Sequence, residues 1–196
     1  MPIKRFGQHF LRDSNALDRM IAPQSDDYML EIGPGQGALT ERLLLTLHKL
    51  QAIEIDRNLS AGLQHKFSRE KLEVYECDAL KFDFGLISSP SNKIRVVGNL
   101  PYNISTPLLF HMTTYIKNIQ NCYFLLQKEV VDRMAAPPGN KQYGRLSVMC
   151  QLYFKVKPLF NIHPNCFFPP PKVNSAFVAL YPRLNYLSKT EDLELL

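Results

Sequence analysis

The chain has 196 residues, a formal net charge of +5 and an isoelectric point of about 9.0, with 45% hydrophobic and 21% charged residues. These values are ordinary for a globular protein with one substantial core. No apolar run approaches the ~20 residues of a membrane span, and the N-terminal residues lack the apolar core of a secretory signal. We therefore expect a cytoplasmic protein without a membrane partner, whose positive charge is compatible with a polyanion.

Short β-rich runs alternate with helical patterns along the first two thirds of the chain. Strands are predicted at residues 28–32, 51–55, 72–76, 94–97 and 122–126, and helices at 39–47, 59–67, 107–116 and 128–135. Such alternation favours an α/β fold, in which helices cover the faces of a parallel sheet. Ser105 or Thr106 would cap the third of these helices, with Pro107 at its first position.

The pattern changes after residue 136. The run Pro137–Lys141 cannot continue a helix and predicts an exposed loop. A helix is predicted at residues 145–154, and strands at 157–162 and 176–181 could close the sheet. From Pro182 the sequence turns polar.

The cysteines and histidines give no sign of a metal site. Cys77, Cys122, Cys150 and Cys166 form no C-x-x-C pair, and the five histidines show no ligand spacing. We expect reduced core thiols and no metal.

Three glycines alternate between a predicted strand and a predicted helix, at Gly33, Gly35 and Gly37. Glycine allows a sharp turn and close approach of a ligand to the backbone. The spacing is one residue shorter than the G-x-G-x-x-G of dinucleotide folds. With an acid two residues before it, this loop resembles the S-adenosylmethionine loop of Rossmann-like methyltransferases.

Two carboxylates follow at the ends of the next two predicted strands. Glu54 lies 21 residues after Gly33 and can accept hydrogen bonds from both ribose hydroxyls. Asp78 could accept from the exocyclic amine of the cofactor's adenine. Either acid alone could instead cap the following helix. Because ligands of open parallel sheets bind at the C-terminal ends of strands, we expect all three features to share one site.

The segment Asn99, Leu100, Pro101 and Tyr102 follows the fourth predicted strand. The Asn99 side-chain carbonyl and a backbone carbonyl at Leu100 or Pro101 could accept both hydrogens of an adenine amine. The nitrogen lone pair would then point at the sulfonium methyl group, so catalysis would come from positioning and electrostatics. Tyr102 would stack on the base. The alternative is a plain strand-to-helix turn.

With these motifs in place, the chain resembles the KsgA/RsmA-type ribosomal RNA adenine dimethyltransferases. The resemblance runs through residues 4–11, 30–37, Glu54, Asp78, 98–105, 126–130, 143–147 and 167–175. It implies a Rossmann-like S-adenosylmethionine-dependent methyltransferase fold, with a mostly parallel seven-stranded sheet and helices on both faces. It places the catalytic domain at residues 1–184. Residues 185–196 would begin a C-terminal helical domain that is otherwise absent.

The resemblance also assigns roles to single residues. Those implied in cofactor binding are Gln8, His9, Leu11, Gly33, Gly35, Gly37, Glu54, Asp78, Ala79 and Asn99. Asn99, Leu100, Pro101 and Tyr102 would hold the target adenine. Phe167 matches the family's second aromatic, so that the base could lie between Tyr102 and Phe167. The alternative is that Phe167 belongs to the core.

The implied reaction transfers methyl groups from S-adenosylmethionine, leaving S-adenosylhomocysteine, without a metal. The implied substrate is the pair of adjacent adenines in the 3′-terminal hairpin loop of small-subunit (16S) rRNA, within a partly assembled ribosomal particle, and the enzyme would be a monomer. Candidate phosphate contacts are Lys4, Arg5, Arg12, Lys141, Arg145 and Lys172.

Other functions remain open on the sequence. The nearest is a large-subunit (23S) rRNA adenine N6-methyltransferase of the antibiotic-resistance type, which would share fold and chemistry. A non-catalytic ribosome-assembly factor is a second, against which the intact Asn99 and Tyr102 argue. A DNA adenine methyltransferase and a dehydrogenase fit less well, since the chain shows no separate sequence-reading domain and has the shorter glycine spacing.

Overall fold

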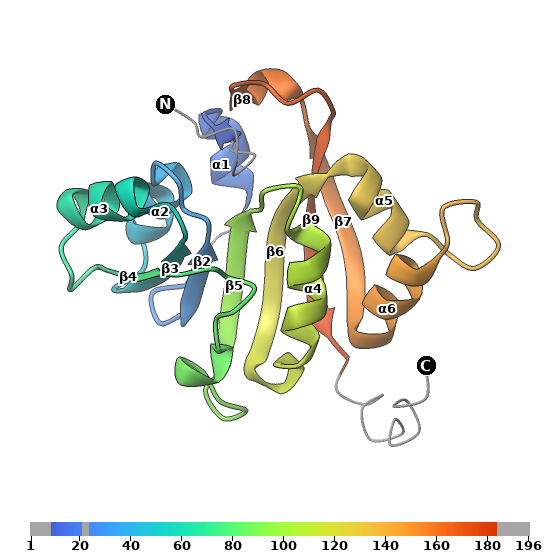
Figure 1. Cartoon of the computed structure of the whole chain (residues 1–196), viewed down its shortest axis with the longest axis horizontal. Helices are drawn as coiled ribbons and strands as arrows, with labels where there is room; N and C mark the ends of the chain where they lie inside the picture. Colours follow the sequence, from blue (N-terminus) through green and yellow to red (C-terminus); the bar gives the residue numbers. More distant parts are fainter. Residues whose placement is uncertain (1–8, 21–23, 184–196) are drawn as a thin grey trace.

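The structure, a computed structural model, describes residues 9–20 and 24–183 (Figure 1). Within these residues, one seven-stranded sheet has the strand order β4-β3-β2-β5-β6-β9-β7. The strands are β2 (Met29–Ile32), β3 (Leu50–Glu54), β4 (Leu72–Glu76), β5 (Ile94–Asn99), β6 (Ile119–Gln127), β7 (Phe154–Ile162) and β9 (Ser175–Pro182). The pairings among β2 to β6 are parallel, and β9 is antiparallel to both β6 and β7. This confirms the predicted fold class.

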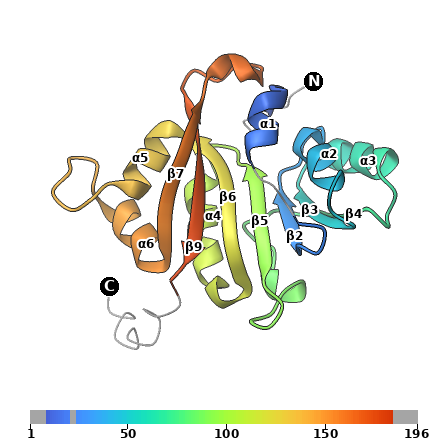
Figure 2. The same cartoon turned by 180° about the vertical axis from the view of Figure 1, so that it is seen from behind.

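Helices cover both faces of the sheet, as Figures 1 and 2 show. The helices are α1 (Ser14–Met20), α2 (Ala38–Leu44), α3 (Arg57–Lys66), α4 (Ser105–Thr113), α5 (Lys128–Ala135) and α6 (Arg145–Tyr153). Short 3-10 turns lie at η2 (Phe84–Leu86), η3 (Ile116–Asn118) and η4 (Pro164–Cys166). Among the described residues, no helix is long and apolar enough to span a membrane.

Two hydrophobic cores lie on opposite faces of the sheet, and neighbouring strand residues alternate between them. Val96 and Phe124 belong to the core that contains buried residues of α4, α5 and α6. The next residue along each strand, Val97 and Leu125, belongs to the core under α1, α2 and α3. This alternation follows from the two-residue period of a strand, and burial on both faces explains the nearly continuous apolar runs.

Helix α4 and strand β7 begin earlier than residues 107 and 157, where the sequence predicted their starts. Helix α4 starts at Ser105 without a side-chain cap, and the Ser105 hydroxyl instead donates to the Tyr102 carbonyl, 3.1 Å away. The predicted caps and the placement of Pro107 at the first position were therefore wrong. Pro107 is tolerated because N–H groups in the first turn have no intrahelical partner. Strand β7 starts at Phe154 because it pairs with β9 as far as Pro182.

A two-stranded ribbon, not predicted from the sequence, joins two distant parts of the chain. Its strands are β1 (Phe10–Leu11) and β8 (Phe167–Phe168), which pair antiparallel. The ribbon lies near the ends of the parallel strands (Figure 1). The predicted C-terminal segment 185–196 lies outside the described residues.

Candidate active site

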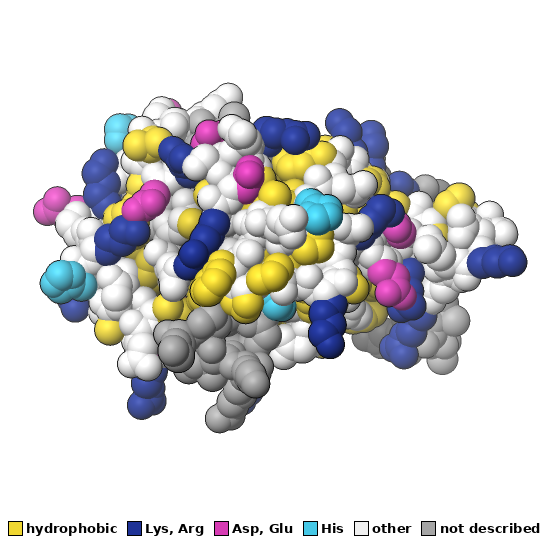
Figure 3. Space-filling model, turned by 90° about the horizontal axis from the view of Figure 1, so that it is seen from above, with side chains coloured by type: hydrophobic (Ala, Val, Ile, Leu, Met, Phe, Trp, Pro, Cys, Tyr) yellow, Lys and Arg dark blue, Asp and Glu magenta, His cyan; other side chains and the backbone are white. Residues whose placement is uncertain are grey.

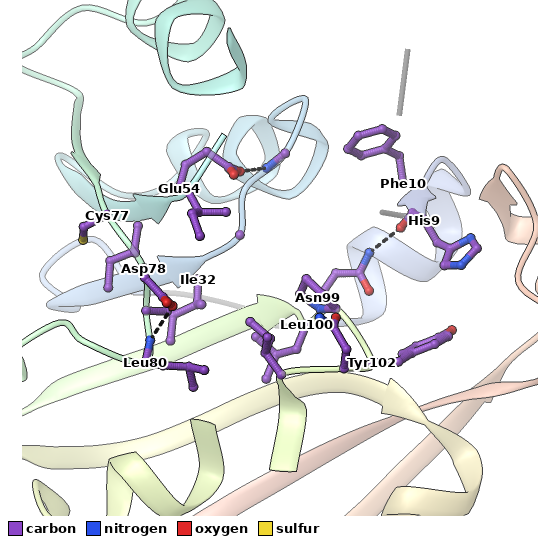
Figure 4. A pocket seen from close by; sticks show the side chains of 18 residues that line it. His9, Phe10, Ile32, Glu54, Cys77, Asp78, Leu80, Asn99, Leu100 and Tyr102 are labelled. Carbon is purple, nitrogen blue, oxygen red and sulfur yellow. Dashed lines mark hydrogen bonds between the residues drawn. The ribbon is translucent and has the colours of Figure 1, made fainter. Parts of the chain in front are cut away.

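A cavity of about 200 Å³ opens at the C-terminal ends of β2, β3, β4 and β5, where the sequence placed the site (Figure 4). The structure brings most of the predicted residues together around it. They are His9, Gly33, Gly35, Glu54, Asp78, Ala79, Asn99, Leu100, Pro101 and Tyr102. The cavity has further walls that the sequence analysis missed, namely Phe10, Ile32, Ile53, Ile55, Cys77, Leu80, Asn103 and Ile104. Several of these residues are direct sequence neighbours of a predicted site residue at a strand end, and this adjacency could have predicted them.

The glycine loop needs backbone conformations that other residues rarely adopt. Gly33, Gly35 and Gly37 have φ angles of 68°, 59° and 82°. A Cβ on Gly35 would lie 2.8 Å from the Phe10 ring, so this loop packs directly against the N-terminal segment. Gly37 does not line the cavity and instead precedes α2, where a Cβ would lie 2.9 Å from Leu63.

Glu54 is fixed by backbone donors on both sides. One carboxylate oxygen accepts the Gly35 N–H at 3.0 Å and the other accepts the Asp56 N–H at 2.9 Å. Burial raises the pKa of Glu54, and the same hydrogen bonds lower it. Glu54 does not cap α3, because Asp56 caps it by accepting from Asn58 and Leu59. The carboxylate is thus held at the cavity wall, where its remaining lone pairs can accept from ligand hydroxyls.

Asp78 lies in the turn that follows β4. Its side chain accepts the Leu80 N–H at 3.0 Å, so it orders this turn and does not cap a helix. A carboxylate has capacity for further hydrogen bonds. Together with the apolar side chains of Ile55 and Leu80, it forms a wall that suits a planar base carrying an amine.

A hydrogen bond to the backbone determines which end of the Asn99 amide faces His9. Its Nδ2 donates to the backbone carbonyl of His9 at 2.8 Å. A carbonyl only accepts, so the amide nitrogen must face His9 and the amide oxygen must point elsewhere. The Pro101 carbonyl already accepts the Ile104 N–H at 3.1 Å, which favours Leu100 as the second carbonyl for an incoming amine.

Tyr102 is held by contacts with two distant segments. Its hydroxyl forms a hydrogen bond with the Ser175 hydroxyl at 2.8 Å, and burial raises the pKa of Tyr102. Its ring stacks against the His9 ring, with 5.7 Å between centroids. His9 Nδ1 in turn lies 2.8 Å from the Pro169 carbonyl. The aromatic wall therefore depends on residues from the start, the middle and the end of the described chain.

The structure does not place Leu11 and Phe167 in this cavity. Both are 4% exposed and pack in the core under α1 and α2. Leu11 lines a second cavity of about 930 Å³, which shares Phe10, Gly33 and Asn99 with the first. In the extended strand β8, neighbouring side chains point to opposite sides, so Phe167 is buried and Phe168 is 50% exposed. Phe167 therefore takes the core position that was the alternative to base stacking.

The second cavity contains a buried acid beside the glycine loop. Glu31 accepts a hydrogen bond from the Thr40 hydroxyl at 2.6 Å. Burial raises the pKa of Glu31 to about 8, although the Thr40 hydrogen bond lowers it. Across residues 9–20 and 24–183, no group of three His, Cys, Asp or Glu side chains is arranged to hold a metal.

The basic candidates divide into two locations. Arg12 and Lys172 are exposed and lie next to β1 and after β8, on the side of the cavity formed by the ribbon. Lys141 and Arg145 are exposed in and after the loop between α5 and α6, on the opposite flank from α3 (Figure 2). Lys4, Arg5 and Gln8 lie outside the described residues.

Comparison with known proteins gives a consistent set of relatives. The family described as "Ribosomal RNA adenine dimethylase" matches residues 3–196. Proteins named "Ribosomal RNA small subunit methyltransferase A" are 49% identical in Shewanella loihica, over 98% of this chain and 73% of that protein, and 53% identical in Hahella chejuensis, over 91% and 67%.

Two solved structures resemble this fold closely. A dimethyladenosine transferase from Plasmodium falciparum matches with a TM-score of 0.82 and 34% identity, over 94% of this chain and 67% of that one. The 23S rRNA methyltransferase ErmE matches with a TM-score of 0.76 and 28% identity, over 89% and 70%.

Proposed function

Because the chain belongs to the ribosomal RNA adenine dimethylase family, we propose that it transfers methyl groups from S-adenosylmethionine to two adjacent adenines near the 3′ end of small-subunit rRNA. The observation that carries the mechanism is the fixed orientation of Asn99. With its nitrogen bound to the His9 carbonyl, its oxygen is available to the amine of a target base.

The residues around the first cavity suit the adenosine part of this cofactor. Glu54, buried and already held by two N–H groups, offers lone pairs to ribose hydroxyls. Asp78 offers a carboxylate to the adenine amine, and Ile55, Ala79 and Leu80 provide apolar surface for its ring. When bound, S-adenosylmethionine supplies a methyl group activated by its sulfonium.

The chain's own groups then act on the target amine. The Asn99 oxygen and the Leu100 carbonyl accept its two hydrogens, which withdraws the lone pair from the ring and aims it at the methyl group. Tyr102, anchored through Ser175, supports the base from one face. The amine nitrogen carries the positive charge after attack and then loses its proton, so no strong general base is needed. Catalysis comes from orientation and from fixed dipoles.

The small-subunit substrate is favoured over the large-subunit alternative by the relatives. Proteins named for the small subunit are 48–53% identical, whereas ErmE is 28% identical. We further propose that the substrate is a partly assembled particle and that the enzyme acts as a cytoplasmic monomer. The net charge of +5 supports an RNA partner.

The test is methylation of small subunits that lack the modification, with labelled S-adenosylmethionine and analysis of the rRNA nucleosides. Dimethyladenosine at the two adjacent loop adenines is the expected product. Label in large subunits alone would support the antibiotic-resistance type of enzyme instead. Cofactor binding with no transfer to either subunit would favour the non-catalytic assembly factor.

A further inference from the structure

Phe168 is a large aromatic side chain that the fold leaves exposed. It is 50% exposed, while the neighbouring Phe167 is buried. It lies opposite Phe10 in the β1–β8 ribbon, and Phe10 lines the cavity. The ribbon therefore presents the Phe168 ring beside the site, and this ring belongs to neither hydrophobic core.

A guanidinium lies over this ring. The Arg12 guanidinium carbon is 4.3 Å from the Phe168 ring centroid, and Arg12 is exposed. Lys172, four residues after Phe168, is also exposed. In the part of the chain that the structure describes, neither cation belongs to an ion pair. Arg12 and Phe168 thus form an exposed pair that carries a planar cation. Lys172 contributes a second positive charge that no acid among the described residues pairs with.

Two contacts and one peptide bond connect this pair to the place proposed for the target base. Tyr102 stacks on His9, His9 Nδ1 lies 2.8 Å from the Pro169 carbonyl, and Pro169 follows Phe168 directly. Figure 3 looks onto this end of the molecule, where hydrophobic side chains are exposed among many Lys and Arg side chains. An RNA strand that places one base against Tyr102 would pass this surface.

We propose that Arg12 and Phe168 form a stacking platform for the unpaired nucleotide next to the target adenine. This inference rests on the proposed function. Guanidinium planes and aromatic rings stack bases of unpaired RNA, and the positive charge also attracts the phosphate. The neighbouring base would stack on the outer face of the Arg12 guanidinium, whose inner face rests on Phe168. The platform would thereby hold the second adenine close to the site while the first is methylated.

The test measures binding of a hairpin RNA with two adjacent loop adenines, in the presence of S-adenosylhomocysteine. Arg12→Lys keeps the charge and removes the plane, and Phe168→Ala removes its support. Each variant is expected to bind about 10-fold more weakly than wild type, the scale of one stacked base. The double variant should bind no more weakly than either single variant. Leu86→Ala, at a 77% exposed apolar residue in η2, serves as the matched control.

Abasic RNAs identify the base involved. An abasic site at the adenine that stacks on the platform should weaken wild-type binding about 10-fold. The Phe168→Ala variant should bind this RNA as tightly as it binds the intact hairpin, because the base and Phe168 take part in one interaction. Equal sensitivity of wild type and Phe168→Ala to both abasic RNAs would overturn the platform. So would wild-type affinity in both single variants.

The two proposals fail in different ways. Absence of methyl transfer to small subunits by the wild type would reject the proposed function, whatever the variants bind. Normal dimethylation by wild type, together with unchanged RNA affinity in Phe168→Ala and Arg12→Lys, would reject only the platform. Thermal unfolding of both variants checks that the ribbon remains folded.

Discussion

Asn99 illustrates how single residues of this site are oriented by the chain itself. Its amide nitrogen is bound by the His9 carbonyl, so the amide cannot rotate without losing a hydrogen bond. Glu54 is held in the same manner by Gly35 and Asp56. Groups fixed before a ligand arrives need little reorganisation during the reaction, which is the basis of electrostatic catalysis.

Replacement of Asn99 by alanine should therefore abolish most of the methyl transfer. We expect a loss of about 10²–10³-fold in rate, the usual effect of removing one oriented polar group. The rate of labelled methyl incorporation into small subunits measures it. Asn161→Ala, at an exposed position of β7 that lines neither cavity, is the matched control. An unmutated rate in Asn99→Ala would contradict the mechanism.

The buried Glu31 should make stability depend on pH. Burial raises its pKa from the ordinary 4.5 to about 8, so between these values the folded state holds a proton that the unfolded chain has released. The stabilisation that this proton gives the folded state is therefore complete below pH 4.5, and it is lost as the pH rises through 8. Relative to Glu31→Gln, wild type should lose on the order of 3–5 kcal/mol of unfolding free energy across this range.

Urea unfolding at pH 5 and pH 8 measures this difference. Glu70→Gln, at an exposed position, should follow wild type at both values. A constant difference between wild type and Glu31→Gln would show that Glu31 binds no extra proton in the folded state.

At the scale of elements, the sequence predicted the polar residues at the strand ends but not the β1–β8 ribbon that lies beside them. Glu54, Asp78 and Asn99 follow β-rich runs, and parallel strands bring their C-terminal ends to one edge. The ribbon escaped prediction because strands of two residues carry no hydrophobic period. Which of Phe167 and Phe168 is buried depends on pairing with Leu11 and Phe10, from the other end of the described chain.

The loop between β2 and α2 allows a paired test of backbone strain and packing. Gly35 and Gly139 both have positive φ angles, of 59° and 86°. A Cβ on Gly35 would push the Phe10 ring, whereas a Cβ on Gly139 would meet nothing within 4 Å. Gly139→Ala should cost about 1 kcal/mol from strain alone. Gly35→Ala should cost more and should weaken cofactor binding at least 10-fold.

Denaturant unfolding and calorimetric titration with S-adenosylhomocysteine separate the two effects. Equal stability losses in both variants, with unchanged cofactor affinity in Gly35→Ala, would show that the Phe10 contact does not shape the site.

At the scale of the whole molecule, exposed lysines lie at different ends of the structure, so charge variants at separate sites can locate the RNA footprint. Lys172 lies beside the ribbon, and Lys117 is exposed in η3, beyond the other end of α4. If Lys172 contacts a phosphate, Lys172→Gln should weaken hairpin RNA binding several-fold. It should also lower the slope of log affinity against log salt by about 0.7–0.9. Lys117→Gln should change neither quantity, and identical slopes for both variants would exclude this contact.

The ribbon also has a consequence for biosynthesis. His9 and Pro169 are separated by 160 positions in the sequence, yet their contact and the β1–β8 pairing build one wall of the cavity. During translation Phe10 is synthesised long before Phe168, so strand β1 has no partner until β8 has been translated. Contacts between such distant segments form slowly. The cavity is therefore completed only after Phe168 has been translated, and a ribosome-bound intermediate that already contains the glycine loop is still without this wall.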